Sequence, residues 1–146
     1  MINKSREIQG IVAKHLCKSE QRVYTDVEEW REIQTFLARS ISELMKYTGN
    51  CPNEEGERIL AVLMGYTLSV RNAQNIITIL QKAEEVLPHI SNKLLKCKLA
   101  VFCYGECMNE ELGTLALTLM EELQESGNEK ELHCLRELLQ SFALQL

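Results

Sequence analysis

Apolar residues recur at helical spacing along most of the chain, and no segment alternates apolar and polar residues over the length of a strand. Seven Gly and two Pro among 146 residues are about half the average usage, so the chain has little material for turns. Both features favour long helices joined by short loops. We therefore predict an all-α fold, a compact antiparallel bundle of six or seven helices with a helical-hairpin organisation, forming a single helical domain over residues 1–146.

Residues that cap or break helices mark where the expected helices begin and end. Thr25 followed by Glu28 has the spacing of a capping box. Pro88 is expected to stop one helix, and Gly105 to end another in the left-handed conformation. The seven expected helices run from about 4 to 17, from Thr25 to before Gly49, from Asn53 to 68, from 72 to 87, from Ser91 to Tyr104, from Asn109 to Gly127, and from Asn128 onward.

Two of these helices are apolar around nearly their whole circumference, which is typical of a central position. They cover residues 59–68 and 94–104, and we predict that both cross the middle of the bundle. The helix after Thr25 is amphipathic instead. Its apolar positions form one continuous stripe, made of Val27, Trp30, Ile33, Leu37, Ile41 and Leu44.

The net charge of -5 is unevenly distributed along the chain. Residues 1–104 hold 14 Lys and Arg against 12 Asp and Glu, whereas residues 105–146 hold 2 against 9. Binding to a nucleic-acid backbone requires a positive surface, so we expect no direct contact with nucleic acid. A basic protein partner suits the acidic C-terminal part, although solvated helix faces carry such glutamates as well.

Three of the six cysteines lie within the stretch CKLAVFCYGEC, at Cys97, Cys103 and Cys107. At about 100° per residue Cys97 and Cys103 do not share a helix face, no C-x-x-C is present, and the nearest histidine is His89. We therefore predict no metal site. A nucleophilic cysteine would need a base brought close by folding, which the sequence leaves open.

Motifs that carry catalysis are absent from the sequence. It contains no glycine-rich phosphate loop, no H-E-x-x-H and no Ser-centred elbow. We accordingly expect a protein that is not an enzyme, with no catalytic residue and no cofactor.

The chain begins with the polar stretch MINKSREIQG and contains no apolar run of the 18 or so residues that a membrane span requires. We expect a cytoplasmic protein without a membrane association. In that compartment six cysteines without a secretory signal are better interpreted as reduced thiols than as a disulfide framework.

Two stretches, LLKCKLAVFCYGECMNEEL and LMGYTLSVRN, resemble the UpxZ family of Bacteroides-type bacteria, small proteins encoded with capsular polysaccharide loci. The similarity covers roughly residues 60–120 and leaves the first 50 residues unplaced. The positions that carry it are Leu63, Met64, Gly65, Tyr66, Leu94, Leu95, Cys97, Leu99, Cys103, Tyr104, Gly105, Glu106, Glu111 and Leu112.

The resemblance implies a transcription antitermination antagonist. Members of this family inhibit the NusG-like antiterminators (UpxY) of other capsule loci, so that one surface polysaccharide dominates expression. The implied partner is a protein, a NusG-like (UpxY-type) antitermination factor, and the family brings no catalytic residues to carry over.

A tetratricopeptide-like adaptor that binds a peptide or protein partner is the alternative function. Its basis is the offset of about 37 to 39 residues between LAVLMGYTL and LAVFCYGEC, but only two such units are found where a solenoid needs three or more.

The predicted partner-binding surface is the acidic hairpin corner after residue 104. Its members are Tyr104, Gly105, Glu106, Glu110 and Glu111. A change of charge sign along the chain, an exposed tip and a tyrosine support an interface there. The alternative role is local, because the same residues would end one helix and begin the next.

Overall fold

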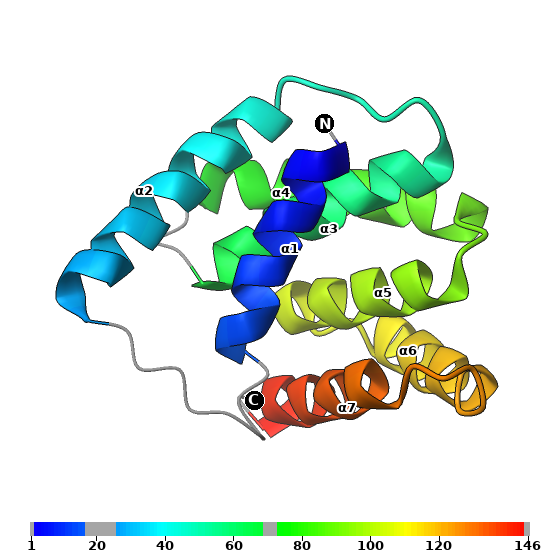
Figure 1. Cartoon of the computed structure of the whole chain (residues 1–146). Coiled ribbons are helices and arrows are strands. Elements are labelled where there is room, and N and C mark those ends of the chain that lie inside the picture. Colours follow the sequence, from blue (N-terminus) through cyan, green and yellow to red (C-terminus); the bar gives the residue numbers. More distant parts are fainter. Residues whose placement is uncertain (1, 17–25, 69–72, 145–146) are drawn as a thin grey trace.

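The structure is a computed structural model of the whole chain and describes residues 2–16, 26–68 and 73–144 (Figure 1). Those residues form helices and no strand, which confirms the all-α prediction. The elements are α1 (Ile2–Leu16), α2 (Val27–Leu44), α3 (Pro52–Leu68), α4 (Ala73–Val86), a 3-10 turn η1 (Leu87–His89), α5 (Lys93–Cys107), α6 (Glu110–Glu122) and α7 (Glu129–Leu144).

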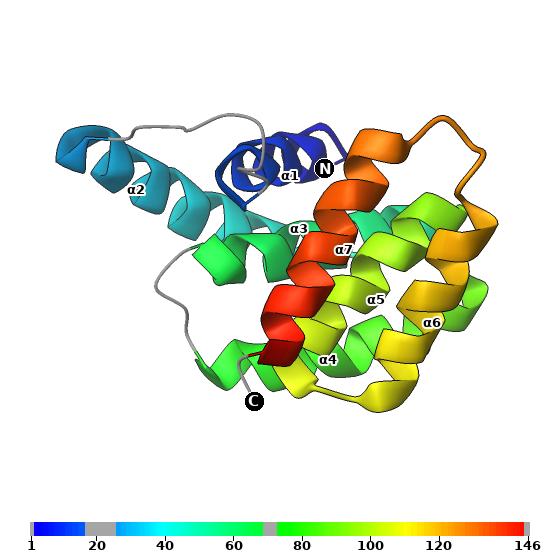
Figure 2. The ribbon, with the colours of Figure 1, turned by 90° about the horizontal axis from the view of Figure 1, so that it is seen from below.

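Helices α3 and α5 lie at the centre of the bundle. Residues 58–66 of α3 and 99–103 of α5 are buried without interruption, so neither helix keeps a solvent face there. Helices α1, α2 and α4 pack on α3, while α6 and α7 pack on α5 (Figure 2). The prediction that these two apolar helices are central is therefore confirmed.

The apolar core divides into two clusters that meet at α5. The larger cluster joins α1, α2, α3 and α4 to one face of α5. The smaller one lies between α5, α6 and α7 and is built from residues 97 to 139. Tyr104, Leu138 and Phe142 pack against both clusters, so these side chains connect the two parts of the core.

Side-chain caps begin three of the described helices, two of them at a different residue from the prediction. Asp26, not Thr25, caps α2, and its Oδ1 accepts a hydrogen bond of 2.8 Å from the backbone N–H of Glu29. Thr25 lies outside the described residues. Asn109 caps α6 as predicted, accepting 2.9 Å from the N–H of Glu111.

Asn53 and Ser91, both predicted as caps, bind each other instead. Helix α3 already begins at Pro52, whose fixed φ suits the first helical turn. Helix α5 is capped by Asn92, which accepts 3.1 Å from the N–H of Leu95. The Asn53 side-chain amide donates a hydrogen bond of 3.0 Å to the Ser91 hydroxyl. Its Oδ1 accepts a second hydrogen bond of 3.0 Å from the Ser91 backbone N–H. The two residues thus tie the start of α3 to the start of α5.

Gly105 does not end α5, contrary to the prediction. The helix continues to Cys107, and Met108 takes the left-handed conformation, with φ of 55° and its N–H donating 2.8 Å to the Tyr104 carbonyl. Gly105 is needed for space instead. A Cβ at this position would lie 2.8 Å from ring atoms of Phe142, so glycine lets α7 approach α5 closely.

Two other glycines lie beyond the ends of their helices. Helix α2 ends at Leu44, before Gly49, and α6 ends at Glu122, earlier than the predicted end at Gly127. Gly127 has a φ of 86° in the turn before α7, a conformation that glycine adopts without strain.

A buried arginine, whose burial the sequence pattern does not indicate, joins α2 to α3. The side chain of Arg58 is fully buried; its Nε donates to Glu55 Oε1 and its Nη1 donates 3.0 Å to the Leu44 carbonyl. Its Nη2 has no hydrogen-bond partner among the described residues. Glu55 Oε1 also accepts 3.3 Å from the N–H of Gly49, so one ion pair fixes the α2–α3 loop at both of its ends.

Burial of Glu55 acts to raise the pKa of this carboxyl, but the hydrogen bonds from Arg58 and Gly49, together with the Arg58 charge, outweigh it. The pKa of Glu55 is lowered from 4.5 as a result. Glu55 therefore stays ionised beside the buried guanidinium at neutral pH.

Candidate functional site

The predicted site residues come together at the corner between α5 and α6. Tyr104, Gly105 and Glu106 belong to the last turn of α5, and Glu110 and Glu111 to the first turn of α6. The left-handed Met108 and the Asn109 cap make the turn between them tight. Glu110 and Glu111 are exposed, whereas Glu106 is half-buried.

Tyr104 and Gly105 support this corner from the inside. Tyr104 is half-buried and packs against both core clusters, and its ring lies 3.2 Å from where a Cβ of Gly113 would be. Gly105 faces Phe142. Of the five predicted site residues, Glu110 and Glu111 therefore offer their carboxylates to solvent, and Glu106 does so in part.

The corner has charge but no large exposed apolar side chain. Among the described residues the exposed large hydrophobics lie on α2, the loop after it, α4 and α6: Val27, Trp30, Tyr47, Ile77 and Leu117. Protein interfaces usually combine an apolar centre with a polar rim. The corner therefore has the character of a rim.

The cysteines of α5 are unsuited to nucleophilic chemistry. Burial raises the pKa of Cys97 to about 11 and that of Cys103 to about 12, so both remain protonated thiols at neutral pH. Cys107 is exposed, and its Sγ donates 3.1 Å to the Cys103 carbonyl. No group of three or more potential metal ligands occurs within the described ranges.

The prediction that the cysteines are reduced thiols is wrong for Cys134, while Cys17 lies outside the described residues. Cys51, Cys97, Cys103 and Cys107 are free, whereas Cys134 on α7 is disulfide-bonded. The sequence contains no signal for this bond, since cysteine pairing depends on which helices meet in space.

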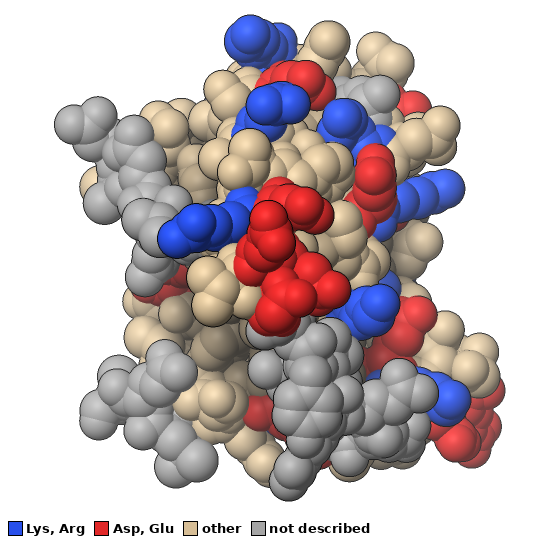
Figure 3. Space-filling view, turned by 60° about the vertical axis from the view of Figure 1, so that its left-hand side comes forward, with Lys and Arg blue, Asp and Glu red and all other residues tan. Residues whose placement is uncertain are grey.

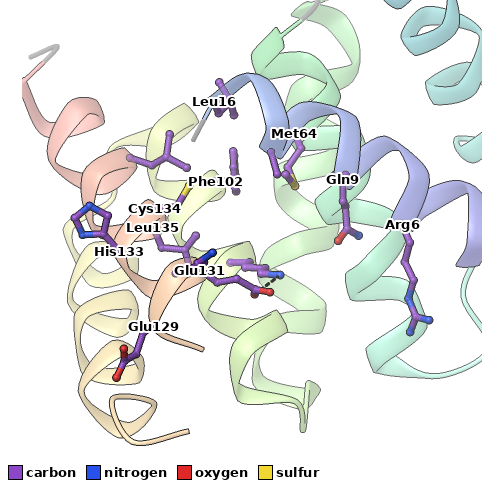
Figure 4. Close-up of a pocket in the computed structure, with 15 residues that line it drawn as sticks. Arg6, Gln9, Leu16, Met64, Phe102, Glu129, Glu131, His133, Cys134 and Leu135 are labelled. Carbon is purple, nitrogen blue, oxygen red and sulfur yellow. Dashed lines mark ion pairs between the residues drawn. The ribbon is translucent and has the colours of Figure 1, made fainter. Parts of the chain in front are cut away.

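A groove of about 660 Å³ lies between α1 and α7, with α3 and α5 as its floor (Figure 4). Buried side chains of Met64, Phe102 and Leu135 line it. At its rim Lys98 of α5 pairs with Glu131 of α7 at 2.9 Å. The sequence pattern does not indicate this groove, because apolar residues that line a groove show the same spacing as apolar residues in a core.

This groove suits an apolar side chain better than a reaction. Lys98 and Glu131 are already paired with each other, and Cys134 at its edge is disulfide-bonded. His133 points away from α1 and pairs with Glu137 at 3.0 Å. Helices α1 and α7 flank the groove, so it does not arise from stacking the α3–α4 hairpin on the α5–α6 hairpin, as the tetratricopeptide-like alternative would require.

Comparison with known families identifies the chain. The sequence profile of the UpxZ family of transcription anti-terminator antagonists matches residues 6–105. The chain belongs to the UpxZ family. The match includes α1 and α2, which the resemblance left unplaced, and it ends inside the α5–α6 corner, before Glu106.

A solved structure has the same fold. It is the crystal structure of a transcription anti-terminator antagonist UpxZ from Bacteroides uniformis ATCC 8492, with a TM-score of 0.79 and 25% sequence identity to this UpxZ family member. The superposition covers 97% of this chain and 91% of the other. No curated protein matches the chain.

The regulatory character of the family agrees with the site as described. The chain shares its family with transcription anti-terminator antagonists and its fold with a solved member of that family. Antagonism of an anti-terminator implies a protein partner. None of the helices in the described residues is long and apolar enough to cross a membrane.

Proposed function

We propose that this protein antagonises a NusG-like, UpxY-type antitermination factor that controls a capsular polysaccharide operon, and that it acts in the cytoplasm by direct protein contact. The observation that supports this function is the match of the anti-terminator antagonist family to residues 6–105. The chain contributes no catalytic residue and no cofactor; it acts by occupying a surface of the factor.

Contact with the factor fits the charge of the chain better than competition for RNA or DNA. The sequence pI is about 5.3, and residues 105–146 carry nine carboxylates against two basic side chains. A phosphate backbone would be repelled by such a surface, whereas a basic protein would be attracted to it.

The α5–α6 corner is the acidic rim of the proposed contact. Tyr104 and Gly105 hold it in shape, while Glu106, Glu110 and Glu111 supply the charges that attract a basic factor. Rim charges mainly set the association rate and its dependence on salt.

The triple variant Glu106→Lys, Glu110→Lys, Glu111→Lys tests this role by surface plasmon resonance against the purified factor. We expect an association rate lowered by about tenfold or more at low salt, with a weaker dependence on ionic strength. Unchanged association and salt response in a folded variant would show that the corner lies outside the interface.

A second triple variant provides the matched control. It places Lys at three exposed glutamates of α4, α6 and the turn after α6, namely Glu85, Glu121 and Glu125, and changes the net charge equally. An equal effect in both variants would mean that only the overall charge matters. Antagonism itself is measured as loss of terminator readthrough in a transcription reaction with the factor. If the wild-type protein neither binds the factor nor reduces readthrough, the proposed function is wrong.

A further inference from the structure

The apolar stripe of α2 is only half used by the fold. Leu37, Ile41 and Leu44 in the C-terminal half are buried against α3 and α1. In the N-terminal half the stripe continues through Val27 and Trp30, which are 71% and 38% exposed. Leaving such groups in water sacrifices hydrophobic stabilisation, so an apolar stripe that runs past the body of a protein is typical of a contact surface.

The first turns of α2, residues 26–32, form a projecting segment that we call the α2 tip. All seven residues are exposed, and the tip reaches beyond the other helices (Figures 1 and 2). It is nevertheless well defined as a helix. Asp26 caps its start, and beyond it Gln34 donates 3.0 Å to the Leu68 carbonyl, which anchors α2 to α3.

The Trp30 indole is held on one side by His15 of α1, with 6.1 Å between the ring centroids and an angle of 59° between the rings. This contact restricts the tryptophan, while 38% of its surface stays exposed. A preorganised aromatic side chain loses little conformational entropy on binding, and tryptophan is enriched among the residues that dominate interfaces.

The charges around this apolar pair favour a basic partner. The α2 tip carries Asp26, Glu28, Glu29 and Glu32 against one basic residue, Arg31. Figure 3 turns the side of the molecule that carries α2 toward the viewer, and acidic side chains gather near the middle of that face. A symmetric contact between two copies would bring these like charges together, which disfavours a second copy as the occupant.

We infer that the α2 tip is the apolar anchor of the contact with the antitermination factor: Val27 and Trp30 insert into an apolar groove that has a basic rim on that factor. The inference rests on the proposed function and deepens it. It adds an apolar contact, which the α5–α6 corner lacks, and an amphipathic helix placed in a groove is a common mode of protein recognition.

Two substitutions test the anchor by isothermal titration calorimetry with the purified factor. Val27→Glu changes a side chain that the fold does not need, and Trp30→Ala removes the larger apolar surface. We expect each to raise the Kd by about tenfold or more, as is usual at the centre of an interface. The matched control is Ile77→Glu on α4. Ile77 is also β-branched and is 64% exposed, and its substitution should leave the Kd unchanged.

The outcomes separate the anchor from the proposed function. If the wild-type protein binds the factor and both α2-tip variants bind equally well, the inference is wrong and the proposed function stands. An equal loss in Ile77→Glu would also overturn the inference, because the effect would not be specific to α2. If sedimentation shows a wild-type dimer that Val27→Glu dissociates while factor binding is unchanged, a second copy occupies the tip. If the wild-type protein does not bind the factor at all, both proposals fall.

Discussion

Substitution of Gly105 by Ala tests the close approach between α5 and α7. Two effects of opposite sign compete at this position. Alanine has a helix propensity about 1 kcal/mol more favourable than glycine, and Gly105 is helical. Its Cβ, however, would lie 2.8 Å from the Phe142 ring, and such overpacking costs about 1–3 kcal/mol. We therefore expect Gly105→Ala to lower the free energy of unfolding by up to about 2 kcal/mol.

A double-mutant cycle with Phe142→Ala isolates the steric part. Without the ring only the propensity remains, so Gly105→Ala should stabilise that background by about 1 kcal/mol, measured by urea unfolding followed by circular dichroism. The sign of the effect thus reverses between backgrounds. If Gly105 were a left-handed helix end, as its sequence context suggests, alanine would destabilise both backgrounds equally. Equal destabilisation would therefore refute the close-approach explanation.

Three further predictions concern Leu99, the Glu55–Arg58 pair and the cysteines of α5. Leu99→Ala should lower the free energy of unfolding by about 2–5 kcal/mol in urea titration, and a negligible loss would contradict the central position of α5. The pKa of Glu55 is lowered in the folded state by Arg58, so its contribution to stability is present above pH 4.5 and is lost as the pH falls further. Glu55→Gln should thus be less stable than wild type at pH 7, with a smaller loss on acidification; parallel pH profiles would show that the pair adds nothing. Iodoacetamide should alkylate exposed Cys107 in the native protein but reach Cys103, whose pKa is about 12, only on unfolding, as mass spectrometry of timed samples would show.

The spacing of apolar residues predicted the helices well. A helix that is buried on one face has apolar residues at helical spacing, and a helix that is buried on all faces is apolar throughout. The central helices α3 and α5 were found for this reason. Helix ends were less certain, because a cap needs only one short polar side chain and several candidates stand side by side. Asn53 and Ser91 are suitable caps by type, yet each finds a better partner in the other, 38 residues away in the chain.

The candidate site was predictable only as far as local residues determine it. The capping role of Asn109 and the exposure of Glu110 and Glu111 follow from the sequence around them. The role of Gly105 depends on Phe142, which approaches from α7. Exposure of Trp30 depends on where α2 leaves the body of the bundle, and periodicity alone cannot distinguish a buried stripe from an exposed one.

The smaller core cluster has a consequence for folding during translation. Among the described residues, the face of α5 that includes Cys97, Ala100 and Val101 packs against α6 and α7, which are translated after it. A nascent chain that has reached residue 105 thus contains everything that the family profile matches, but one of its central helices is still half uncovered. Such a chain resembles the aggregation-prone intermediates that chaperones bind. The end of the recognisable family sequence is therefore not a place where the chain can be cut, and a fragment ending there should aggregate rather than fold.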